Sequence, residues 1–331
     1  MFNKYFFSLK KSICIFFYRL MQKFTITLIG KIAASGKGSD LCLKEGFLPV
    51  PINFYSPIPD ILDLNKRKIW NIKSKMIGID LRKDAQIHLL KILGEKYSNE
   101  CNWPRLLAQN SNDFYTENNS FGGGCAAITH SIIRHFKPER VVEIGSGKSS
   151  LIIAKAIKLN DSEANRESRY TVIDPYPSDI VKKKMVTKRL IEKRVELLDL
   201  SFFECLKEND ILFIDSGHSV RIGGDVNFLY LEVMPRLAPG VIVHIHDIRL
   251  PYEYSERLAK NETFRQFWTE QYILQSFLCF NRDFEILLAC NFLMVDYKSD
   301  FLKSFPHCSL GEHPSSFWIR RKVDFSQVLK K

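Results

Sequence analysis

Short apolar runs that alternate with amphipathic stretches are the strongest pattern in the second half of the chain. Stretches with helical spacing separate these runs, and three consecutive glycines at 122–124 precede them. The runs, several rich in β-branched residues, lie at 141–144, 170–173, 195–198, 211–214 and 241–245. Strands that alternate with helices predict right-handed β-α-β units and a parallel sheet with helices on both faces. The expected fold class is therefore α/β, doubly wound.

The parts of the chain on either side of this pattern predict further elements. Apolar runs at 284–295 and 317–323, with no helical spacing between them, predict an antiparallel pair at one edge of the sheet. Four prolines in 46–60 force an extended connector. Helical spacing follows over 61–94, where Asp84 can cap a second helix and Gly94 can end it. We expect three parts: a basic aromatic segment (1–40), an extension or cap (41–120) and the α/β domain (121–331).

The net charge of +11 raises three classes of partner: nucleic acid, an anionic membrane or an acidic substrate. Seven lysines and arginines precede the first acidic residue, Asp40, which leaves +4 for the rest of the chain. A body this close to neutral gives no reason to expect a nucleic-acid groove, so no nucleic-acid partner is predicted.

Many aromatic and aliphatic residues lie among the N-terminal charges. Such a basic segment can rest in a membrane interface, so peripheral membrane contact through residues 1–38 is one interpretation. Packing on the body, or on a second copy in a homo-oligomer, is the alternative. A cleaved signal peptide fits less well, because the apolar run 13–18 is short and Arg19 and Lys23 follow it. No apolar run approaches the ~20 residues that span a bilayer, which excludes a polytopic membrane protein.

Eight cysteines are scattered along the chain, without a C-x-x-C pair or a Cys/His cluster at zinc spacing. This usage favours a reducing, cytoplasmic environment over a disulfide framework or a structural zinc site.

The turn that follows the run at 141–144 contains Gly145-Ser146-Gly147 and leads into a helix. Backbone can approach a ligand closely at such a turn, and the helix start offers free N–H groups. A P-loop would need glycine at 142, which is valine, and a dinucleotide fingerprint would want glycine at 150, which is serine. Neither alternative fits well. The third interpretation rests on Glu143, two residues before the first glycine, which can pair with a cationic ligand.

The acid-x-Gly-x-Gly turn resembles the first motif of class I S-adenosylmethionine-dependent methyltransferases. The resemblance implies an S-adenosylmethionine cofactor and a seven-stranded sheet of order 3-2-1-4-5-7-6. By the same resemblance, Asp174 binds the ribose and Asp199 contacts the adenine, while Asp215 ends strand four. The cofactor-binding residues implied are Glu143, Gly145, Ser146, Gly147, Asp174, Asp199 and Asp215.

The segments 212–219 and 244–247 end adjacent predicted strands, so their polar side chains should converge at one edge of the sheet. The pattern Ile-Asp-x-x-His-Ser, followed by a strand that ends His-Asp, is similar to the bacterial methyltransferase family 24. His218 is the leading base, since an imidazole titrates near neutrality, and Asp215 is its catalytic neighbour. The alternative is that His218 only orients a loop or a bound carboxylate.

Asp215, His246 and Asp247 can instead bind a divalent cation that lowers the pKa of the acceptor hydroxyl. Macrocin-type O-methyltransferases are similar here, but they place two acids at the end of strand five, where this chain has His246 first. A metal softer than Mg²⁺ would tolerate that imidazole. A hydrogen-bonded structural cluster is the other interpretation of these residues. His244, inside the strand, is expected to be a satisfied core histidine.

These features predict O-methylation of a small hydroxylated or glycan acceptor. Acceptor specificity would come from the insert 251–280 and from the N-terminal extension. DNA base methylation is not expected, because Asp215-Ser216-Gly217 lacks the Pro-Pro-aromatic motif of that class. The alternative function is a membrane-recruited binding or scaffold protein that keeps the fold without catalysis.

Overall fold

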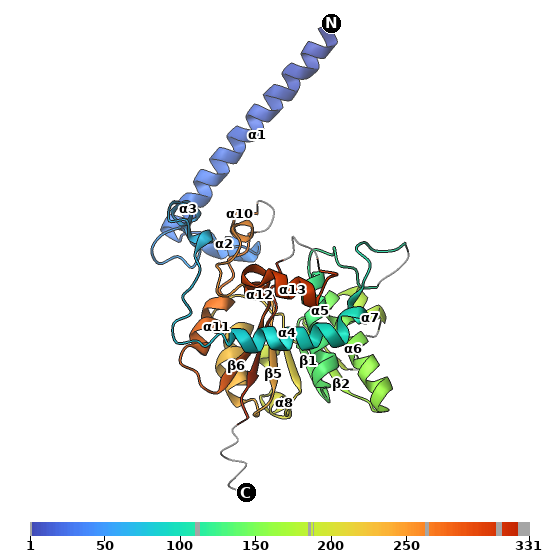
Figure 1. The fold of residues 1–331 in the computed structure, drawn as a ribbon. Coiled ribbons are helices and arrows are strands. Elements are labelled where there is room, and N and C mark those ends of the chain that lie inside the picture. The colour runs from blue at the N-terminus through green and yellow to red at the C-terminus, as the bar shows by residue number, and fades with distance from the viewer. Residues whose placement is uncertain are drawn as a thin grey trace. The chain divides into compact units, whose positions relative to one another are not determined.

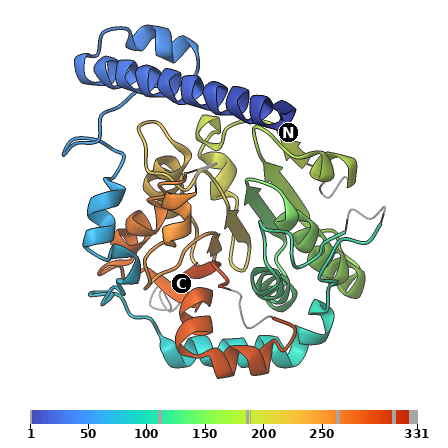
Figure 2. The same ribbon diagram turned by 90° about the horizontal axis from the view of Figure 1, so that it is seen from above.

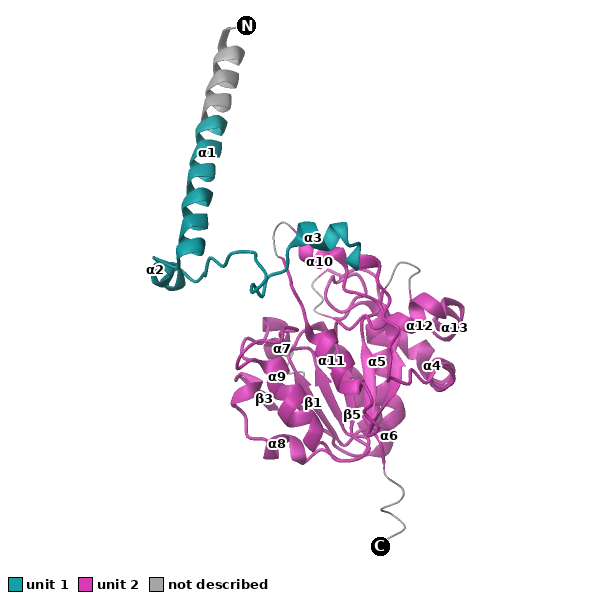
Figure 3. Cartoon of the chain, turned by 90° about the vertical axis from the view of Figure 1, so that its left-hand side faces the viewer, with its two compact units in different colours: residues 1–69 teal, residues 70–331 magenta. Residues whose placement is uncertain are grey.

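The computed structural model describes residues 2–109, 113–184, 187, 189–261, 265–308 and 313–323. Side chains are described from residue 15 on, except that of Lys184. The chain divides into two compact units, residues 1–69 and 70–331 (Figure 3). We describe each unit by itself; the predicted boundaries at 40 and 120 stay predictions.

The described residues of the first unit form the helices α1 (Phe2–Ser35), α2 (Ser39–Lys44) and α3 (Ile61–Lys66). Gly36 has a φ of 70°, a left-handed conformation that suits the residue after a helix end. The proline-rich stretch before α3 has neither helix nor strand, as predicted. Asp60 caps α3, because its carboxylate accepts hydrogen bonds from the backbone N–H groups of Leu62 and Asp63.

The second unit is built on a seven-stranded sheet with the order β3-β2-β1-β4-β5-β7-β6 (Figure 1). The pairs among β1 to β5 are parallel, and β7 pairs antiparallel with both β5 and β6. The predicted fold class, strand order and antiparallel edge pair are therefore confirmed. The strands are β1 (Arg140–Ile144), β2 (Arg169–Ile173), β3 (Arg189–Ile191), β4 (Ile211–Ile214), β5 (Ile242–Ile245), β6 (Phe284–Ala289) and β7 (Phe317–Arg321).

Helices cover both faces of this sheet (Figure 2). One layer contains α4 (Lys83–Tyr97), α5 (Gly123–Phe136) and α6 (Lys148–Ala164). The opposite layer contains α9 (Asp225–Phe228), its continuation η4 (Leu229–Val233) and η5 (Met234–Arg236), and α11 (Glu270–Leu278). The remaining helices are η1 (Ile69–Asn71), η2 (Ser98–Cys101), α7 (Asp179–Lys184), η3 (Val195–Leu197), α8 (Ser201–Glu204), α10 (Glu256–Lys260), α12 (Cys290–Asp296) and α13 (Lys298–Ser304).

The central strands are apolar at nearly every position because both of their faces are covered. All four residues of β4 and all four of β5 are buried, including His244. A half-exposed strand would alternate apolar and polar residues instead. The continuous apolar runs in the sequence therefore reflect the two helical layers.

The prediction for the third strand was wrong. The run 195–198 contains the short helix η3, and β3 lies earlier, where Leu190 pairs with Val172. This edge strand is only three residues long and carries little apolar surface. Its sequence therefore merged with the helical spacing of 179–193, whereas α7 ends at Lys184.

Three predictions about helices were also wrong: the absence of helical structure after the run that begins at 284, the helix end at Gly94 and the cap at Asp84. The segment 290–304 forms α12 and α13, although no helical spacing was recognised there. Gly94 does not end its helix but lies inside α4, where an added Cβ would come 2.5 Å from the backbone oxygen of Ser304. Glycine thus lets α4 and α13 approach closely. Asp84 lies in the first turn of α4, whose N-cap is Arg82.

Candidate functional site

The loop after β1 packs directly against the end of β4. Gly145 has a φ of 78°, and a Cβ at this position would lie 1.9 Å from the backbone oxygen of Asp215. The backbone N–H of Gly145 donates to the carbonyl of Ile173 at 2.9 Å, and that of Asp215 donates to Ile144 at 2.9 Å. The ends of β1, β2 and β4 are thereby tied together, and glycine is required at 145.

A cavity of about 540 Å³ opens at the ends of these strands. Asp174 lies on its wall at the end of β2, where its carboxylate accepts hydrogen bonds from the Ser146 hydroxyl at 2.5 Å and the Tyr176 N–H at 2.7 Å. Of the predicted cofactor residues, the cavity is lined by Gly145, Ser146, Asp174 and Asp215. A carboxylate held at a strand end and facing a cavity is a ready acceptor for ligand hydroxyls.

Glu143 lies beneath the loop and does not line this cavity. It is fully buried, and its carboxylate accepts hydrogen bonds from Ser149 at 2.7 Å, from Ser150 at 2.8 Å and from the Tyr170 hydroxyl. Burial raises the pKa of Glu143 to about 7, although these hydrogen bonds oppose the rise. Glu143 therefore fixes the start of α6, and direct contact with a ligand remains a prediction for it.

Gly147 does not line the cavity, but the space that a side chain would occupy at this position is open. Apart from its own chain neighbours, no atom of the described residues lies within 4 Å of the position that a Cβ would occupy there. Its N–H donates to the Ser150 hydroxyl at 3.1 Å. The fold therefore leaves room beside the backbone at this position.

Asp199 is exposed and lies off the cavity wall. Its carboxylate accepts a hydrogen bond from the N–H of Ser201 at 2.9 Å, and hydrogen bonding to Ser201 lowers the pKa of Asp199. The acid that lines the cavity in this region is Glu196, which is paired with Arg194 at 2.7 Å. Sequence reasoning missed Glu196 because it placed strand three over this residue.

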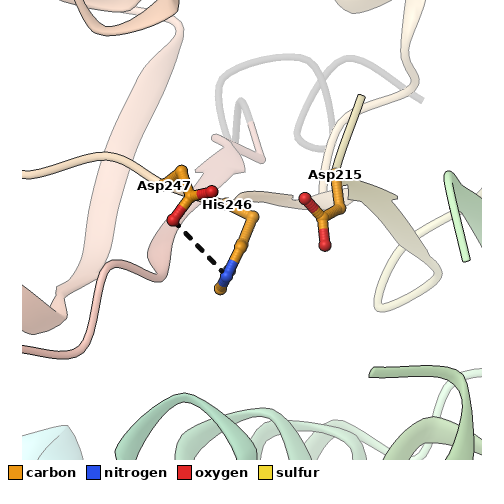
Figure 4. A group of neighbouring side chains, drawn as sticks. All are labelled: Asp215, His246 and Asp247. Carbon is orange, nitrogen blue, oxygen red and sulfur yellow. Dashed lines mark ion pairs between the residues drawn. The ribbon is translucent and has the colours of Figure 1, made fainter. Parts of the chain in front are cut away.

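The three predicted metal-binding residues lie together at the adjoining ends of β4 and β5 (Figure 4). One ligand atom each from Asp215, His246 and Asp247 can be chosen so that all lie within 4.8 Å of one another. His246 Nε2 is 3.7 Å from a carboxylate oxygen of Asp247. Two carboxylates and one imidazole in this arrangement form a donor set that suits a divalent transition metal.

Neighbouring histidines determine the pKa of Asp215. Burial would raise the pKa of Asp215, but the neighbouring His246 and His218 outweigh it and lower this pKa to about 2. Asp215 is therefore a carboxylate at neutral pH. The ring of His246 lies 5.0 Å from that of Phe121, and its Nδ1 is buried without a hydrogen-bond partner among the described residues.

His218 lies against the same carboxylates. Its Nε2 is 3.3 Å from Asp215 and 3.6 Å from Asp247, and its Nδ1 is 2.8 Å from the carboxylate of Glu270. Burial opposes the protonated form, but Asp215 and Glu270 outweigh it and raise the pKa of His218 well above its ordinary value. The sequence gives no sign that Glu270 pairs with His218, because 52 residues separate them.

His244 is a core residue, as predicted, but it is not satisfied. Its ring stacks on Phe213 at a centroid distance of 3.7 Å, and neither ring nitrogen has a hydrogen-bond partner within the described part of the chain. Burial lowers the pKa of His244 well below its ordinary value. The neutral ring packs as an aromatic side chain, which corrects the expectation of hydrogen bonds.

Similarity to known proteins decides the family. The model of a methyltransferase domain, family 24, matches residues 142–248, which include the Gly145 loop and the ends of β4 and β5. An uncharacterized protein from Archaeoglobus fulgidus is 34% identical over 205 residues, which cover 60% of this chain and 88% of that relative. The chain belongs to the class I S-adenosylmethionine-dependent methyltransferases.

Two solved structures are also similar to this methyltransferase. One is a SAM-dependent methyltransferase from Archaeoglobus fulgidus, with 15% identity, a TM-score of 0.32, and coverage of 60% of this chain and 94% of that one. The other is a putative methyltransferase from Thermobifida fusca, with 13% identity, a TM-score of 0.37, and coverage of 75% and 97%. The strand order of the sheet was established above without them.

The methyltransferase cavity fits the cofactor that the family uses. Its volume lies within the ordinary range for small-molecule sites, the Gly147 position leaves open space, and the carboxylate of Asp174 can accept hydrogen bonds from ribose hydroxyls. Asp174 and the Gly145 loop would hold S-adenosylmethionine, which supplies an electrophilic methyl group on a sulfonium. Within the described residues, no helix of the methyltransferase is both long and apolar enough to cross a bilayer.

Proposed function

We propose that the protein is an O-methyltransferase for a small hydroxylated or glycan acceptor. The observation that carries this proposal is the position of His218, whose Nε2 lies 3.3 Å from Asp215, a residue of the cavity wall. A hydroxyl placed there can lose its proton to Nε2 while its oxygen forms the bond to the methyl carbon. S-adenosylmethionine held in the cavity would supply the methyl group, and its sulfonium sulfur would keep the electron pair of the carbon–sulfur bond.

The same acids support a divalent cation as a second cofactor. Asp215, His246 and Asp247 would hold it, and a cation there lowers the pKa of a bound hydroxyl. A cation also adds positive charge beside His218, which favours the neutral imidazole that a base requires. Calorimetric titration with Mn²⁺ tests the site: we expect binding to the wild type and at least tenfold weaker binding to Asp247→Asn. Equal binding to both would exclude Asp247 as a ligand.

The acceptor can be found with labelled cofactor. Bacterial cell-envelope extracts are incubated with methyl-labelled S-adenosylmethionine and either the wild type or His218→Gln. We expect label in a glycan or small-molecule fraction with the wild type, and a loss of at least 100-fold with the variant. Cofactor binding should be the same in both, because His218 does not line the cavity. Label that appears on protein or nucleic acid would contradict the acceptor class.

Helix α1 supports a second proposal, that the enzyme works at an anionic membrane surface on the cytoplasmic side. Phe17, Met21, Phe24 and Leu28 recur at helical spacing, and between 49% and 67% of each residue's surface is exposed. Arg19 and Lys23 are exposed on another side of the helix. The absence of acidic residues before Asp40 favours an anionic lipid surface over a second, equally basic copy of the segment.

The non-catalytic scaffold remains the alternative function. Such a protein would be recruited to the membrane through α1 and would bind the cofactor, but it would transfer no methyl label to any extract. The paired His218 and Glu270 favour an enzyme instead, because a buried ionisable pair is costly to maintain without a role.

A further inference from the structure

We propose that Glu270 is a positioning residue for the proposed base: it holds Nδ1 of His218 so that Nε2 faces Asp215 and Asp247 at the ends of β4 and β5. The inference rests on the proposed role of His218 and adds a residue from the insert after β5. It assigns a function to a buried carboxylate that neither the cofactor cavity nor the candidate metal site uses.

The contact between the two side chains is short and enclosed. Glu270 Oε2 lies 2.8 Å from His218 Nδ1; Glu270 has no exposed surface, and only 7% of His218 is exposed. Burial raises the pKa of Glu270, and the hydrogen bond to His218 works against that rise. A carboxylate in such a place needs a donor, and the imidazole N–H can supply one.

Backbone contacts hold the imidazole in this orientation as well. The N–H groups of Thr269 and Glu270 both donate to the carbonyl of His218, at 2.9 and 3.1 Å. The Thr269 hydroxyl accepts a hydrogen bond from the N–H of Val220 at 2.7 Å. The ring of Trp268 packs on that of His218 at a centroid distance of 4.7 Å. Residues 268–270 therefore hold the loop at His218 and at Val220, and they also pack against the His218 ring.

This arrangement assigns separate tasks to the two ring nitrogens. Nδ1 faces the Glu270 carboxylate at 2.8 Å, and Nε2 lies 3.3 Å from Asp215 and 3.6 Å from Asp247. A hydrogen bond at one ring nitrogen fixes the ring and leaves the other nitrogen for a different partner. Glu270 therefore determines which nitrogen faces the ends of β4 and β5, and its carboxylate stabilises positive charge on the ring.

The experiment is proton NMR of the full chain labelled with ¹⁵N-histidine. We expect a slowly exchanging, low-field Nδ1–H resonance, assigned by its loss in His218→Gln. Glu270→Gln should move this resonance strongly upfield or abolish it. Glu253→Gln is the matched control: Glu253 is another insert carboxylate, which accepts from Tyr272 at 2.6 Å, and its loss should leave the resonance in place.

The outcomes separate this inference from the proposed function. A low-field resonance that is unchanged in Glu270→Gln, or absent from the folded wild type, overturns the role of Glu270. If Glu270→Gln does not fold, the wild-type resonance and its loss in His218→Gln still decide the question. S-adenosylmethionine binding is measured on the same samples, and its absence contradicts the proposed function whatever the resonance shows.

Discussion

At the scale of single residues, two acids of the cofactor region have different tasks. Asp174 faces the cavity, whereas Glu143 is enclosed by the side chains at the start of α6. A carboxylate that is exposed to ligand can exchange water for ligand hydroxyls. A fully buried one acts through the backbone that it holds in place.

Asp174 should therefore affect cofactor affinity strongly, and Asp199 should not. Hydrogen bonds to a charged group contribute about 1.5–3 kcal/mol, so we expect Asp174→Ala to weaken S-adenosylmethionine binding about 10- to 100-fold. Asp199→Ala is the control, because Asp199 is exposed and lies off the cavity wall. Calorimetric titration measures both, and a larger loss with Asp199→Ala would return the adenine contact to that residue.

Glu143 should make the folded state less stable as pH rises. Its pKa is about 7 in the folded protein against an ordinary value of 4.5, so the folded state binds the proton more tightly. The contribution of the protonated form is fully present below pH 4.5 and is lost as pH rises through 7, a change of about 3 kcal/mol.

Chemical denaturation at several pH values checks this prediction. Between pH 4.5 and 7, the free energy of unfolding of the wild type should fall relative to that of Glu143→Gln, which cannot titrate. Parallel curves for the two proteins would mean that the pKa of Glu143 is not raised.

Residue types at strand ends could be predicted from the sequence, but contacts across long separations could not. The sequence located Asp174, Asp215 and Asp247 because acids after apolar runs meet at one edge of a parallel sheet. It did not pair His218 with Glu270, since the position of α11 depends on tertiary packing. The metal, base and cofactor roles of these residues remain predictions for the experiments above.

At the scale of elements, the turn between β1 and α6 contains one glycine that the fold requires, Gly145, and one that it does not, Gly147. Gly145→Ala should lower the melting temperature and abolish cofactor binding, since a Cβ would overlap the Asp215 backbone. The left-handed conformation alone costs about 1–2 kcal/mol for alanine. Gly147→Ala should keep the melting temperature, because its Cβ meets open space, yet weaken cofactor binding. Equal melting temperatures for both variants would contradict this distinction.

The burial of each element explains whether it could be predicted from the sequence. Strands β1, β2, β4 and β5 are covered on both faces, so their apolar runs are unmistakable. The edge strand β3 is short and partly exposed, and its misplacement hid Glu196, which lines the cavity where Asp199 does not. Helices α12 and α13 follow β6 directly, so the apolar residues of α12 extended the run of that strand.

At the scale of the whole molecule, the positive charge and the catalytic chemistry belong to different units. The first unit holds seven uncompensated charges and the long helix α1, whereas the second holds the sheet with its cavity and acids. Composition alone could not separate these two contributions. Counting charge along the chain could, because the acidic residues begin at Asp40.

Deleting residues 1–38 should abolish binding to vesicles of mixed neutral and anionic lipid, while cofactor affinity stays unchanged. The full-length variant Met21→Glu/Phe24→Glu should lose the same binding, because both side chains belong to the exposed apolar row of α1. Co-sedimentation measures these effects. Undiminished vesicle binding by the truncated protein would place the membrane contact in the second unit. Self-association of the full chain that the deletion abolishes would instead identify α1 as an interface between copies.

The most direct test of the whole account is calorimetric titration of the purified full chain with S-adenosylmethionine. We expect saturable binding at a single site with a dissociation constant in the micromolar range, with competition by S-adenosylhomocysteine. Absence of saturable binding at millimolar cofactor, in a sample shown to be folded, would contradict it.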